Sequence, residues 1–552
     1  MSPTSLQPCT AQEQNDPPGA EKADVQATQS VLSQTDCHTT PQHVRKIKGI
    51  AWFIVIVAVL SSTFLYALDN TVVANVRPSI VEAFGRIDVL TWLSVAYPMG
   101  EVGSNPLWGK LNNQFNNKVL YLFALLIFEI GSAVIGSAQS VEAIIVGRAV
   151  AGVGGSGIYV GTINIISAIT DPSERNQYLG FVGIAWSLGT ILGPIIGGAF
   201  ADSSATWRWA FYINIVIAAV TSPACIFLIP AIAPPSSDPL FRRIKRIDYL
   251  GFILFLGGVV TFVMILGFGG AIFSWGSGQL IGLYAATVVI WSTFCVQQRL
   301  SIFTIDRIFP VQFVGNWEMV NFFSWTAITI ANVVVTVYSL PLFFQFTYGD
   351  SGLHAALYTL PFVVATVACG GASGPLLPKF PVYMLWFVAA SALMLIAGGL
   401  LSTIDYNTSR GTIIGYTIIQ GFGCGPVIQL GYTVGQVKAP RHAISEVTAF
   451  LTCAQMAGLA LSLGIATSVF LNCATHEISN ILPGLPRDLI QAAINGARAT
   501  IIQDLSPGKQ QEVLEAIARN VSTVFYLNVA GASLGFITAL FMKKERLNLD
   551  IK

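Results

Sequence analysis

Apolar residues dominate fourteen stretches of the chain, and each stretch is bounded by a short polar segment. The hydrocarbon core of a bilayer is about 30 Å thick, so a helix that crosses it needs roughly 20 apolar residues. The pattern therefore predicts an all-α polytopic membrane protein with fourteen transmembrane helices. The predicted spans are 49–77, 89–108, 118–137, 141–169, 176–200, 207–230, 248–269, 278–297, 318–346, 354–374, 381–402, 410–435, 443–472 and 522–542.

The Lys and Arg residues of the loops predict the orientation of the chain. Nineteen of them fall on the side of the two termini, whereas the short loops of the other side hold four, namely Arg77, Arg86, Arg208 and Arg410. Short loops rich in Lys and Arg stay in the cytoplasm. We therefore predict that both termini are cytoplasmic. A long loop on the opposite side holds four more basic residues, but long loops count little in this rule.

The composition agrees with a membrane protein. Of the 552 residues, 53% are hydrophobic and 10% are charged, and the mean hydropathy is +0.65. Ordinary soluble domains carry about 25% charged residues, so this chain cannot cover a water-facing surface of its own size. The eight cysteines are scattered without a CxxC pair, which argues against a disulfide framework and against a metal site. We expect no nucleic-acid partner, and we expect a monomer in the lipid bilayer.

Composition also divides the chain into five parts. Residues 1–46 are rich in Gln, Ser, Thr and Pro and predict a disordered cytoplasmic tail; residues 546–552 predict a second, shorter one. Residues 47–232 and 311–545 predict two six-helix halves, and the second half includes an external loop, 474–521, with a pair of short helices. Residues 233–310 predict a cytoplasmic linker and two extra spans. A weak repeat of glycine-rich runs in the fourth and twelfth spans supports two halves, which is how many transporters are built.

Two ionisable residues of opposite charge inside predicted spans, Asp69 and Arg148, are candidates for proton coupling. Asp69 lies about 13 Å below the outer end of the first span, and Arg148 lies about 10 Å into the fourth span from the same side. An ion pair at this shared level would keep Arg148 partnered. Burial favours a neutral carboxyl group while a nearby cation favours an ionised one, and this competition suits proton exchange. Structural roles stay open for both residues: Asp69 as a polar group near the end of a tilted helix, and Arg148 as a clamp.

Two glutamates lie near the middle of the membrane. Glu101 is in the second span, which is expected to border a central cavity, so we predict that it is a second proton carrier. Glu129 is in the third span, which is expected to be peripheral, so a structural hydrogen bond is the favoured role there.

The fifth span carries small residues at helical spacing, at Gly189, Gly193, Pro194, Gly197 and Gly198. Such spacing lets helix backbones approach closely in lipid, so it predicts a packing seam. We expect this seam to bend the fifth span against its neighbour in the opposite half, so that the two halves can rock about it.

Four longer motifs carry a resemblance to a known family. They are LDNTVVANVRP at 68–78, IVGRAVAG at 145–152, GTILGPIIGG at 189–198 and WRWAFYIN at 207–214. With them the chain, from about Ile47 to Met542, resembles the major facilitator superfamily, in particular its fourteen-span drug:proton antiporters, and most closely the fungal toxin and drug efflux pumps. The resemblance implies the major facilitator fold, with two six-helix halves and two extra central spans. It also implicates the Asp of the first span and the Arg of the fourth span in proton coupling.

One superfamily motif is altered in the loop between spans 2 and 3. This candidate cytoplasmic gate loop contains Gly109, Lys110 and Lys118, and it has Asn113 where the family pattern has aspartate. Asn116 and Asn117 stand where the pattern has Gly-Arg, so a carboxylate–arginine latch is in question. Binding of lipid phosphates by the two lysines and a purely topological role are the alternatives, and we favour the second.

Polar and aromatic residues on the spans expected to line the cavity suggest the cargo. They are Asn164, Trp186, Trp325, Asn332, Tyr338, Gln345, Gln420, Gln429 and Gln455. Neutral amides and aromatic rings suit a bulky, amphipathic, mostly uncharged ligand, although each residue alone is more often a packing or interhelical contact. The chain has no Walker A sequence, so we expect a proton gradient rather than ATP to supply the energy, and no cofactor.

These observations favour a secondary active transporter rather than an enzyme. We predict that it exports a hydrophobic small molecule (a secondary metabolite, toxin or drug) in exchange for protons, by alternating access. The alternatives are an importer of a chelate or nutrient with the same fold and a non-transporting sensor. We expect the plasma membrane, with a vacuolar or vesicle membrane as the alternative, and N-glycosylation at Asn407 and Asn520, which begin Asn-X-Ser/Thr sequences.

Overall fold

The computed structural model describes residues 49–84, 90–201, 203–231, 239–269, 273–350, 352–440, 443–494 and 504–547, all within one compact unit, Arg45–Ile551. The predicted tail 1–46 and residues 548–552 lie outside these ranges. Within them the structure is helical, and β contacts are limited to two isolated bridges, Gly269–Phe273 and Val382–Arg546.

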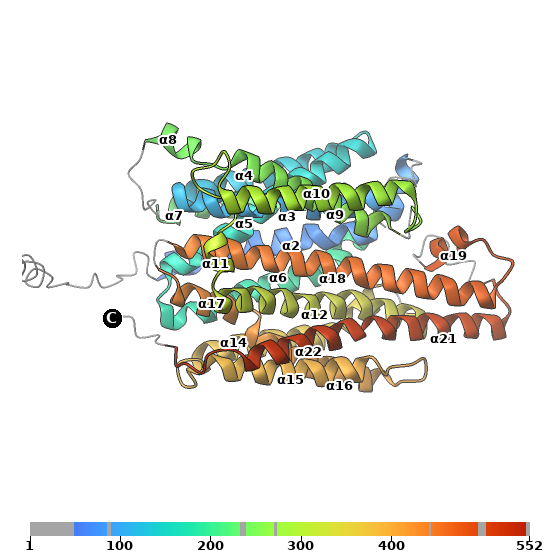
Figure 1. Ribbon diagram of the computed structural model, residues 1–552. Coiled ribbons are helices and arrows are strands. Elements are labelled where there is room, and N and C mark those ends of the chain that lie inside the picture. The colour runs from blue at the N-terminus through green and yellow to red at the C-terminus, as the bar shows by residue number, and fades with distance from the viewer. Residues whose placement is uncertain are drawn as a thin grey trace, which may run out of the picture. The chain divides into compact units, whose positions relative to one another are not determined.

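The helices fall into two groups that pack among themselves, joined by a third, smaller one (Figure 1). The first group, which we call the N-half, comprises α2 (Ile50–Phe84), α3 (Leu90–Gln114), α4 (Asn117–Ser137), α5 (Val141–Ile169), α6 (Pro172–Ala201) and α7 (Trp209–Leu228). The linking helices are α8 (Leu240–Lys245), α9 (Tyr249–Phe268), α10 (Gly278–Leu300) and α11 (Val311–Val314). The C-half comprises α12 (Trp317–Tyr348), α13 (Gly352–Leu357), α14 (Leu360–Leu376), α15 (Tyr383–Leu401), α16 (Arg410–Cys424), the 3-10 turn η1 (Gly425–Val427), α17 (Leu430–Lys438), α18 (Ile444–Ile481), α19 (Arg487–Ile494), α21 (Pro507–Val524) and α22 (Tyr526–Leu540).

Several helices begin at a polar residue whose side chain accepts a hydrogen bond from a free backbone amide of the first turn. Asn116 caps α4, Ser140 caps α5 and Asn316 caps α12 in this way. Such caps satisfy donors that would otherwise lack a partner. They explain why short polar segments separate the apolar stretches so sharply.

Thirteen helices of the described chain are long and apolar enough to cross a membrane. The predicted second span is present as the helix α3 but does not meet this measure, so the count of fourteen is not confirmed. The reason is its content of polar residues, which include Glu101, Asn105 and Asn112. All three are buried, because α3 packs against α5, α9 and α18.

The predicted external loop 474–521 is largely helical. Helix α18 continues to Ile481, and α21 begins at Pro507 and is followed almost directly by α22. Packing of α21 on α12 and α18 explains this extension. Of the expected pair of short external helices, α19 is one; residues 495–503 are outside the described ranges.

The two extra helices, α9 and α10, pack against each other, and α9 also packs on α3. A Cβ atom at Gly103 of α3 would lie 2.3 Å from Leu256 Cδ1 of α9, so glycine is what allows this contact. At the opposite end of α9, the rings of Trp92 and Phe268 meet edge to face, with centroids 5.0 Å apart. The extra pair therefore attaches to the N-half through α3.

One end of the bundle is closed by direct contact between the two halves. We call it the Lys110 end; by the distribution of basic residues it is the predicted cytoplasmic end. There Ser167 of α5 donates a hydrogen bond to Gln436 of α17 (3.0 Å), and a Cβ atom at Gly374 of α14 would lie 2.9 Å from Gln177 of α6. These contacts define a state in which nothing large can pass between the halves at this end.

Candidate functional site

An ion pair between Asp69 and Arg148 lies in the interior of the N-half. Arg148 Nη1 is 3.7 Å from Asp69 Oδ2 and donates a hydrogen bond to the backbone carbonyl of Asp69 (3.2 Å). Both residues are 0% exposed. A buried charge without a partner would be very costly, so the pairing explains how α2 and α5 can each carry a charge inside an apolar bundle. The structure thus brings together two residues that are far apart in the sequence.

Neighbouring side chains hold this pair in place. Asn214 of α7 donates to Asp69 Oδ1 (3.0 Å) and to Ser132 of α4 (3.1 Å), and the Arg148 guanidinium lies over the ring of Tyr97, 4.9 Å from its centroid. Asp69 Oδ2 makes no hydrogen bond among the described residues. That oxygen has the guanidinium 3.7 Å away and a free lone pair, so it is the atom best placed to receive a proton.

The sequence did not assign a role to Asn214 or Tyr97. Asn214 ends the WRWAFYIN motif, so its position was marked, but no local pattern shows that it reaches Asp69. Tyr97 lies four residues before Glu101 on the same helix face, which is the signal that could have identified it.

The two mid-membrane glutamates differ in their contacts. Glu101 is 1% exposed, and its carboxylate accepts a hydrogen bond from the hydroxyl of Tyr66. Glu129 was expected to make a structural hydrogen bond, but neither of its carboxylate oxygens has a partner among the described residues. Glu101, by contrast, lies beside the hydroxyl of Tyr66 and close to Tyr97 and Tyr159.

The glycine-rich run of α5 creates the space for this site. A Cβ atom at Gly152 would lie 2.2 Å from the carbonyl oxygen of Tyr97, and one at Gly155 would lie 2.7 Å from both Tyr66 and Tyr97. Close approach of α3 and of the tyrosine rings therefore requires glycine at these positions. This packing role accounts for a run of glycines inside a helix.

The glycine seam of the fifth span corresponds to α6, and its partner is not the one we expected. Cβ atoms at Gly189, Gly193 and Gly197 would lie 2.4, 2.0 and 2.7 Å from atoms of α2. The seam therefore packs α6 on α2 of the same half, and the expectation of a neighbour in the opposite half is wrong. Glycines four residues apart line one face of the helix, and α2 occupies that face. Pro194 and Gly198 lie in the same helix.

The face of α6 that meets the C-half carries larger side chains. Together with α12 and α14 it encloses a small pocket whose lining consists of Trp186, Ser187, Thr190, Val333, Val337, Phe362, Val363 and Thr366. The indole Nε1 of Trp186 has no acceptor among the described residues. This interface between halves is therefore apolar, with one free donor and a few hydroxyl groups.

The remaining candidate cargo residues do not form one cavity. Gln455 and Gln429 lie between the halves: Tyr159 of α5 donates to Gln455 (3.0 Å), and Gly183 of α6 faces Gln429. Trp325, Asn332 and Gln420 are instead packed within the C-half, where Gln420 donates to Asn332 (3.0 Å) and the ring of Trp325 packs at a tilt against that of Phe387. Tyr338 of α12 is close enough to Arg148 to interact electrostatically. Asn164 is buried, and neither amide atom of its side chain has a hydrogen-bond partner in the part of the chain that the structure describes. Gln345 is exposed.

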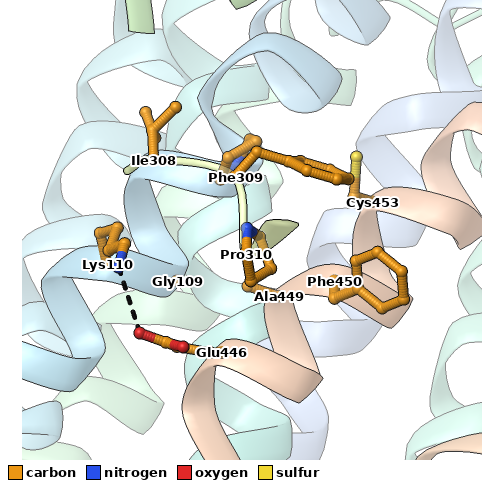
Figure 2. Close-up of a pocket in the computed structure, with 10 residues that line it drawn as sticks. Gly109, Lys110, Ile308, Phe309, Pro310, Glu446, Ala449, Phe450 and Cys453 are labelled. Atoms are coloured by element: carbon orange, nitrogen blue, oxygen red, sulfur yellow. Dashed lines mark hydrogen bonds and ion pairs between the residues drawn. The ribbon is translucent and has the colours of Figure 1, made fainter. Parts of the chain in front are cut away.

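The gate loop is engaged in a contact that the sequence did not predict (Figure 2). Lys110 Nζ of α3 lies 3.1 Å from Glu446 Oε1 of α18, as the dashed line in Figure 2 marks. Asn113 donates a hydrogen bond to the same oxygen (3.0 Å). Gln312 of α11 donates to the other oxygen, Glu446 Oε2 (2.7 Å). Lys110 thus has a carboxylate partner, as in the latch that the family pattern describes, but the carboxylate comes from the opposite half. We call this contact between Lys110 and Glu446 the latch; lipid binding and a topological role of the loop lysines stay predictions. Lys118 takes no part and lies in the first turn of α4.

The backbones are also close at this latch. A Cβ atom at Gly109 would lie 2.1 Å from the Cβ of Ala449, and Asn105 donates to the carbonyl of Ala449 (3.3 Å). The pocket beside the latch in Figure 2 is bordered by Phe309 and Phe450. The connection from the extra helix pair thus lies directly on the contact between the halves.

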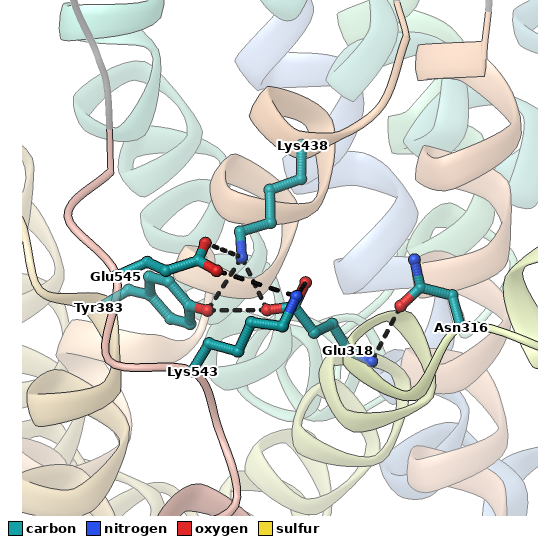
Figure 3. A network of polar contacts seen from close by, with 6 residues as sticks. All are labelled: Asn316, Glu318, Tyr383, Lys438, Lys543 and Glu545. Atoms are coloured by element: carbon teal, nitrogen blue, oxygen red, sulfur yellow. Dashed lines mark hydrogen bonds and ion pairs between the residues drawn. The ribbon is translucent and has the colours of Figure 1, made fainter.

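A second polar cluster at the same end lies within the C-half (Figure 3). Glu318 in the first turn of α12 accepts hydrogen bonds from Lys438 (2.7 Å) and from the hydroxyl of Tyr383 (2.9 Å). Lys543 and Glu545, which follow α22, complete the cluster. The cluster joins four segments of the C-half, namely α12, α15, α17 and the segment after α22. These bonds hold the Lys110 end of the C-half together as one body.

The two predicted glycosylation sites differ in accessibility. Asn407 is exposed in the turn between α15 and α16. Asn520 is 6% exposed in α21, and its amide nitrogen donates to Glu477 (2.6 Å) and to the carbonyl of Ala516 (2.7 Å). The nitrogen that would carry the glycan is occupied inside a helix, so the prediction for Asn520 is wrong.

Comparison with known proteins matches this arrangement. A family model described as Major Facilitator Superfamily matches residues 59–463. The MFS-type transporter pgmG of Aspergillus terreus is 41% identical over 508 residues, which cover 92% of this chain and 91% of that protein. The efflux pump alnA of Emericella nidulans is 38% identical over 92% of this chain and 93% of its own length. A transporter of Leptosphaeria maculans, named for a phomenoic acid biosynthesis cluster, is 38% identical over 92% of this chain and 83% of its own.

Two solved structures share the fold at low sequence identity. The human organic anion transporter MFSD10 (TETRAN) aligns with a TM-score of 0.54 at 15% identity, over 88% of this chain and 100% of that one. The proton:xylose symporter XylE aligns with a TM-score of 0.55 at 14% identity, over 90% of this chain and 97% of that one.

Proposed function

Because the chain belongs to the major facilitator superfamily, we propose that it exports a hydrophobic small molecule in exchange for protons. It is a multi-pass membrane transporter and not an enzyme. Relatives at 38% to 41% identity are named as an efflux pump and as transporters, one of them after a biosynthetic cluster. These names support export over import and a secondary metabolite, toxin or drug as the cargo.

The buried pair of Asp69 and Arg148 is the observation that carries proton exchange. Removing one partner of a buried ion pair typically costs about 3–5 kcal/mol because a charge remains without compensation. Protonation of Asp69 at its free oxygen, Oδ2, would leave the positive charge of Arg148 buried without a compensating negative charge. The Tyr97 ring and the hydroxyl of Tyr338 on α12 are near enough to take up part of the interaction. Proton binding in the N-half would thereby change its attraction to the C-half.

Alternating access requires that the closed end open while the rest of each half stays rigid. The seam between α2 and α6 keeps the N-half together, and the cluster around Glu318 does the same for the C-half. The latch between Lys110 and Glu446 is then the contact that must break. We propose that cargo binds between the halves at the small pocket beside Trp186 once the halves separate there, because apolar walls and one free N–H donor suit a mostly uncharged molecule.

We place the transporter in the plasma membrane, as a monomer with both termini in the cytoplasm. The distribution of Lys and Arg supports this orientation. It puts the latch on the cytoplasmic side and Asn407 on the outer side. Export would then begin from a state in which the latch is open.

The substitution Asp69→Asn tests the proposal. Cells that express the full chain are loaded with the hydrophobic dye Nile red, and the initial rate of efflux is measured at several external pH values. We expect the variant to reach the membrane at the wild-type level but to lose the acceleration of efflux that a proton gradient produces. The matched control is Asp350→Asn, which removes a carboxylate paired with Arg410 (3.0 Å) on the predicted outer side of the C-half.

Two results would contradict the proposal. The first is an Asp69→Asn variant whose efflux still follows the proton gradient as the wild type does. The second is an Asp350→Asn control that loses gradient-driven efflux to the same degree, because the effect would then not be specific to the buried pair.

A further inference from the structure

We infer that Tyr66 is a positioning residue that transmits the protonation state of Glu101 to the C-half. This inference rests on the proposed proton-driven export and names the route by which one proton site acts on the contact between the halves. Tyr66 lies in α2, one helical turn before Asp69, and is 0% exposed. Its hydroxyl donates a hydrogen bond to Glu101 Oε1 of α3.

The same hydroxyl also contacts the opposite half. Tyr66 Oη lies 3.4 Å from the thioether sulfur of Met456 in α18. Thus one atom of α2 lies between a carboxylate of the N-half and a side chain of the C-half. A change in the direction of its hydrogen bond acts on both.

A second tyrosine connects Tyr66 to the residue next to Met456. The rings of Tyr66 and Tyr159 lie with centroids 5.6 Å apart and planes inclined by 32°. Tyr159 donates a hydrogen bond to Gln455 Oε1 (3.0 Å), and this oxygen also accepts one from Tyr432 of the C-half (2.6 Å). The two tyrosines of the N-half therefore contact consecutive residues of α18, Gln455 and Met456. The same helix carries the latch residue Glu446, ten positions before Met456.

The surroundings leave Tyr66 little freedom to move by itself. The hydroxyl of Tyr97 donates to the backbone carbonyl of Tyr66 (3.1 Å), and Gly155 provides the space in which the Tyr66 and Tyr97 rings lie. In a packed interior a side chain that has two bonding arrangements switches between them rather than drifting. The hydroxyl of Tyr66 has two such arrangements, one for each form of Glu101.

The two forms of Glu101 differ in what they require from Tyr66. An ionised carboxylate only accepts hydrogen bonds, so the Tyr66 hydroxyl must donate to it. A protonated carboxyl has a hydrogen of its own and can donate to the Tyr66 oxygen. The phenolic hydrogen is then free to turn towards the sulfur of Met456. Protonation of Glu101 thus reverses one hydrogen bond and changes a contact between the halves.

Other titratable groups also act on Glu101. They are Tyr66 of α2, Tyr97 of α3 itself, and Arg148 and Tyr159 of α5. Asp69 of α2 acts on Tyr97 and Arg148, and Cys453 of α18 contacts Asn105 of α3. The fourth packed helix, α9, has no ionisable residue besides Tyr249 at its start. Of these groups, Tyr66 is the one that both bonds Glu101 and touches the C-half.

The experiment follows the opening of the Lys110 end directly, so it needs no known cargo. A donor and an acceptor dye are introduced through non-natural amino acids at the exposed positions Asp171 of the N-half and Lys379 of the C-half. The full-length protein is placed in lipid nanodiscs, and the fraction of molecules with a short distance between the dyes is measured as a function of pH. The variants are Tyr66→Phe and Tyr159→Phe, and Tyr121→Phe is the matched control, since Tyr121 is equally buried in the N-half but does not bond Glu101.

We expect the wild-type protein to change its closed fraction with a defined pH midpoint. Tyr66→Phe removes a donor that favours ionised Glu101, so protonation becomes easier and the midpoint rises by about one to two pH units, as loss of a hydrogen bond to a charged group predicts. Tyr159→Phe breaks the bond to Gln455, so it lowers the closed fraction at every pH and leaves the midpoint in place. Tyr121→Phe leaves both quantities as in the wild type.

The outcomes separate this inference from the proposed function. A wild-type protein whose closed fraction does not depend on pH overturns the proton coupling and the inference together. A pH-dependent wild type with an unchanged midpoint in Tyr66→Phe overturns the inference alone. If Tyr66→Phe does not fold, a lowered closed fraction with an unchanged midpoint in Tyr159→Phe supports the route, and a Tyr159→Phe protein identical to the wild type overturns it.

Discussion

The latch between Lys110 and Glu446 allows a quantitative prediction about the closed state. At 3.1 Å, an effective dielectric constant of about 20 gives an attraction of roughly 5 kcal/mol. Both side chains keep 15% of their surface exposed, and desolvation offsets much of this attraction. We therefore expect a net coupling of about 1–2 kcal/mol, which corresponds to a factor of about 5–30 in the ratio of closed to open molecules.

A double-mutant cycle measures this coupling. The variants are Lys110→Met, Glu446→Gln and the pair of them together, and the readout is the closed fraction from the dyes at positions 171 and 379. The cycle cancels effects that each substitution has by itself. Glu446→Gln alone should open the end more than Lys110→Met, because the carboxylate also accepts hydrogen bonds from Asn113 and Gln312.

The control cycle uses Arg519→Met and Glu477→Gln. This ion pair has a similar length, 3.4 Å, but it joins α21 to α18 within the C-half, and its side chains are 68% and 31% exposed. It should not affect the closed fraction. A coupling of zero for the latch, or an equal coupling for the control pair, would refute the assignment of Lys110 and Glu446 to the closed state.

Three further predictions concern packing, modification and the C-half. Gly193→Ala places a Cβ atom 2.0 Å from Thr71 and should destabilise the fold by about 1–3 kcal/mol, visible as a lower Tm in detergent. Asn407→Gln should increase electrophoretic mobility by the mass of one glycan, as enzymatic deglycosylation does, whereas Asn520→Gln should not, because its amide is buried. Glu318→Gln should cost about 1–2 kcal/mol and lower the Tm, because Lys438 loses its shortest ionic contact.

The first prediction has a control variant in the chain, and the other two have outcomes that would contradict them. Gly282→Ala in α10 adds a methyl group where nothing lies within 4 Å, so its Tm should not fall. For the glycan, a mobility shift in Asn520→Gln would show that α21 is not folded as described when the chain is modified. For Glu318, a wild-type Tm in the variant would contradict the importance of the cluster in Figure 3.

Much of the architecture follows from the sequence by itself. Apolar stretches of membrane length must form helices, since backbone polar groups cannot remain unbonded in lipid. Polar caps such as Asn116 and Ser140 mark where the helices begin. The isolated charges of Asp69 and Arg148 at similar depth were sufficient to predict that they lie near each other, because a single buried charge needs a partner.

The partners across helices were decided by the tertiary structure alone. Spacing shows that Gly193 lies on a packing face, but a helix face carries no information about which helix covers it; here α2 does, and not a helix of the other half. The altered loop shows that the carboxylate expected at position 113 is missing, and only the fold brings Glu446, more than 300 residues later, to Lys110. The same holds for Tyr66, whose contacts to Glu101 and Met456 arise from three helices. Local sequence determines which residues form helices, while long-range packing determines which side chains meet.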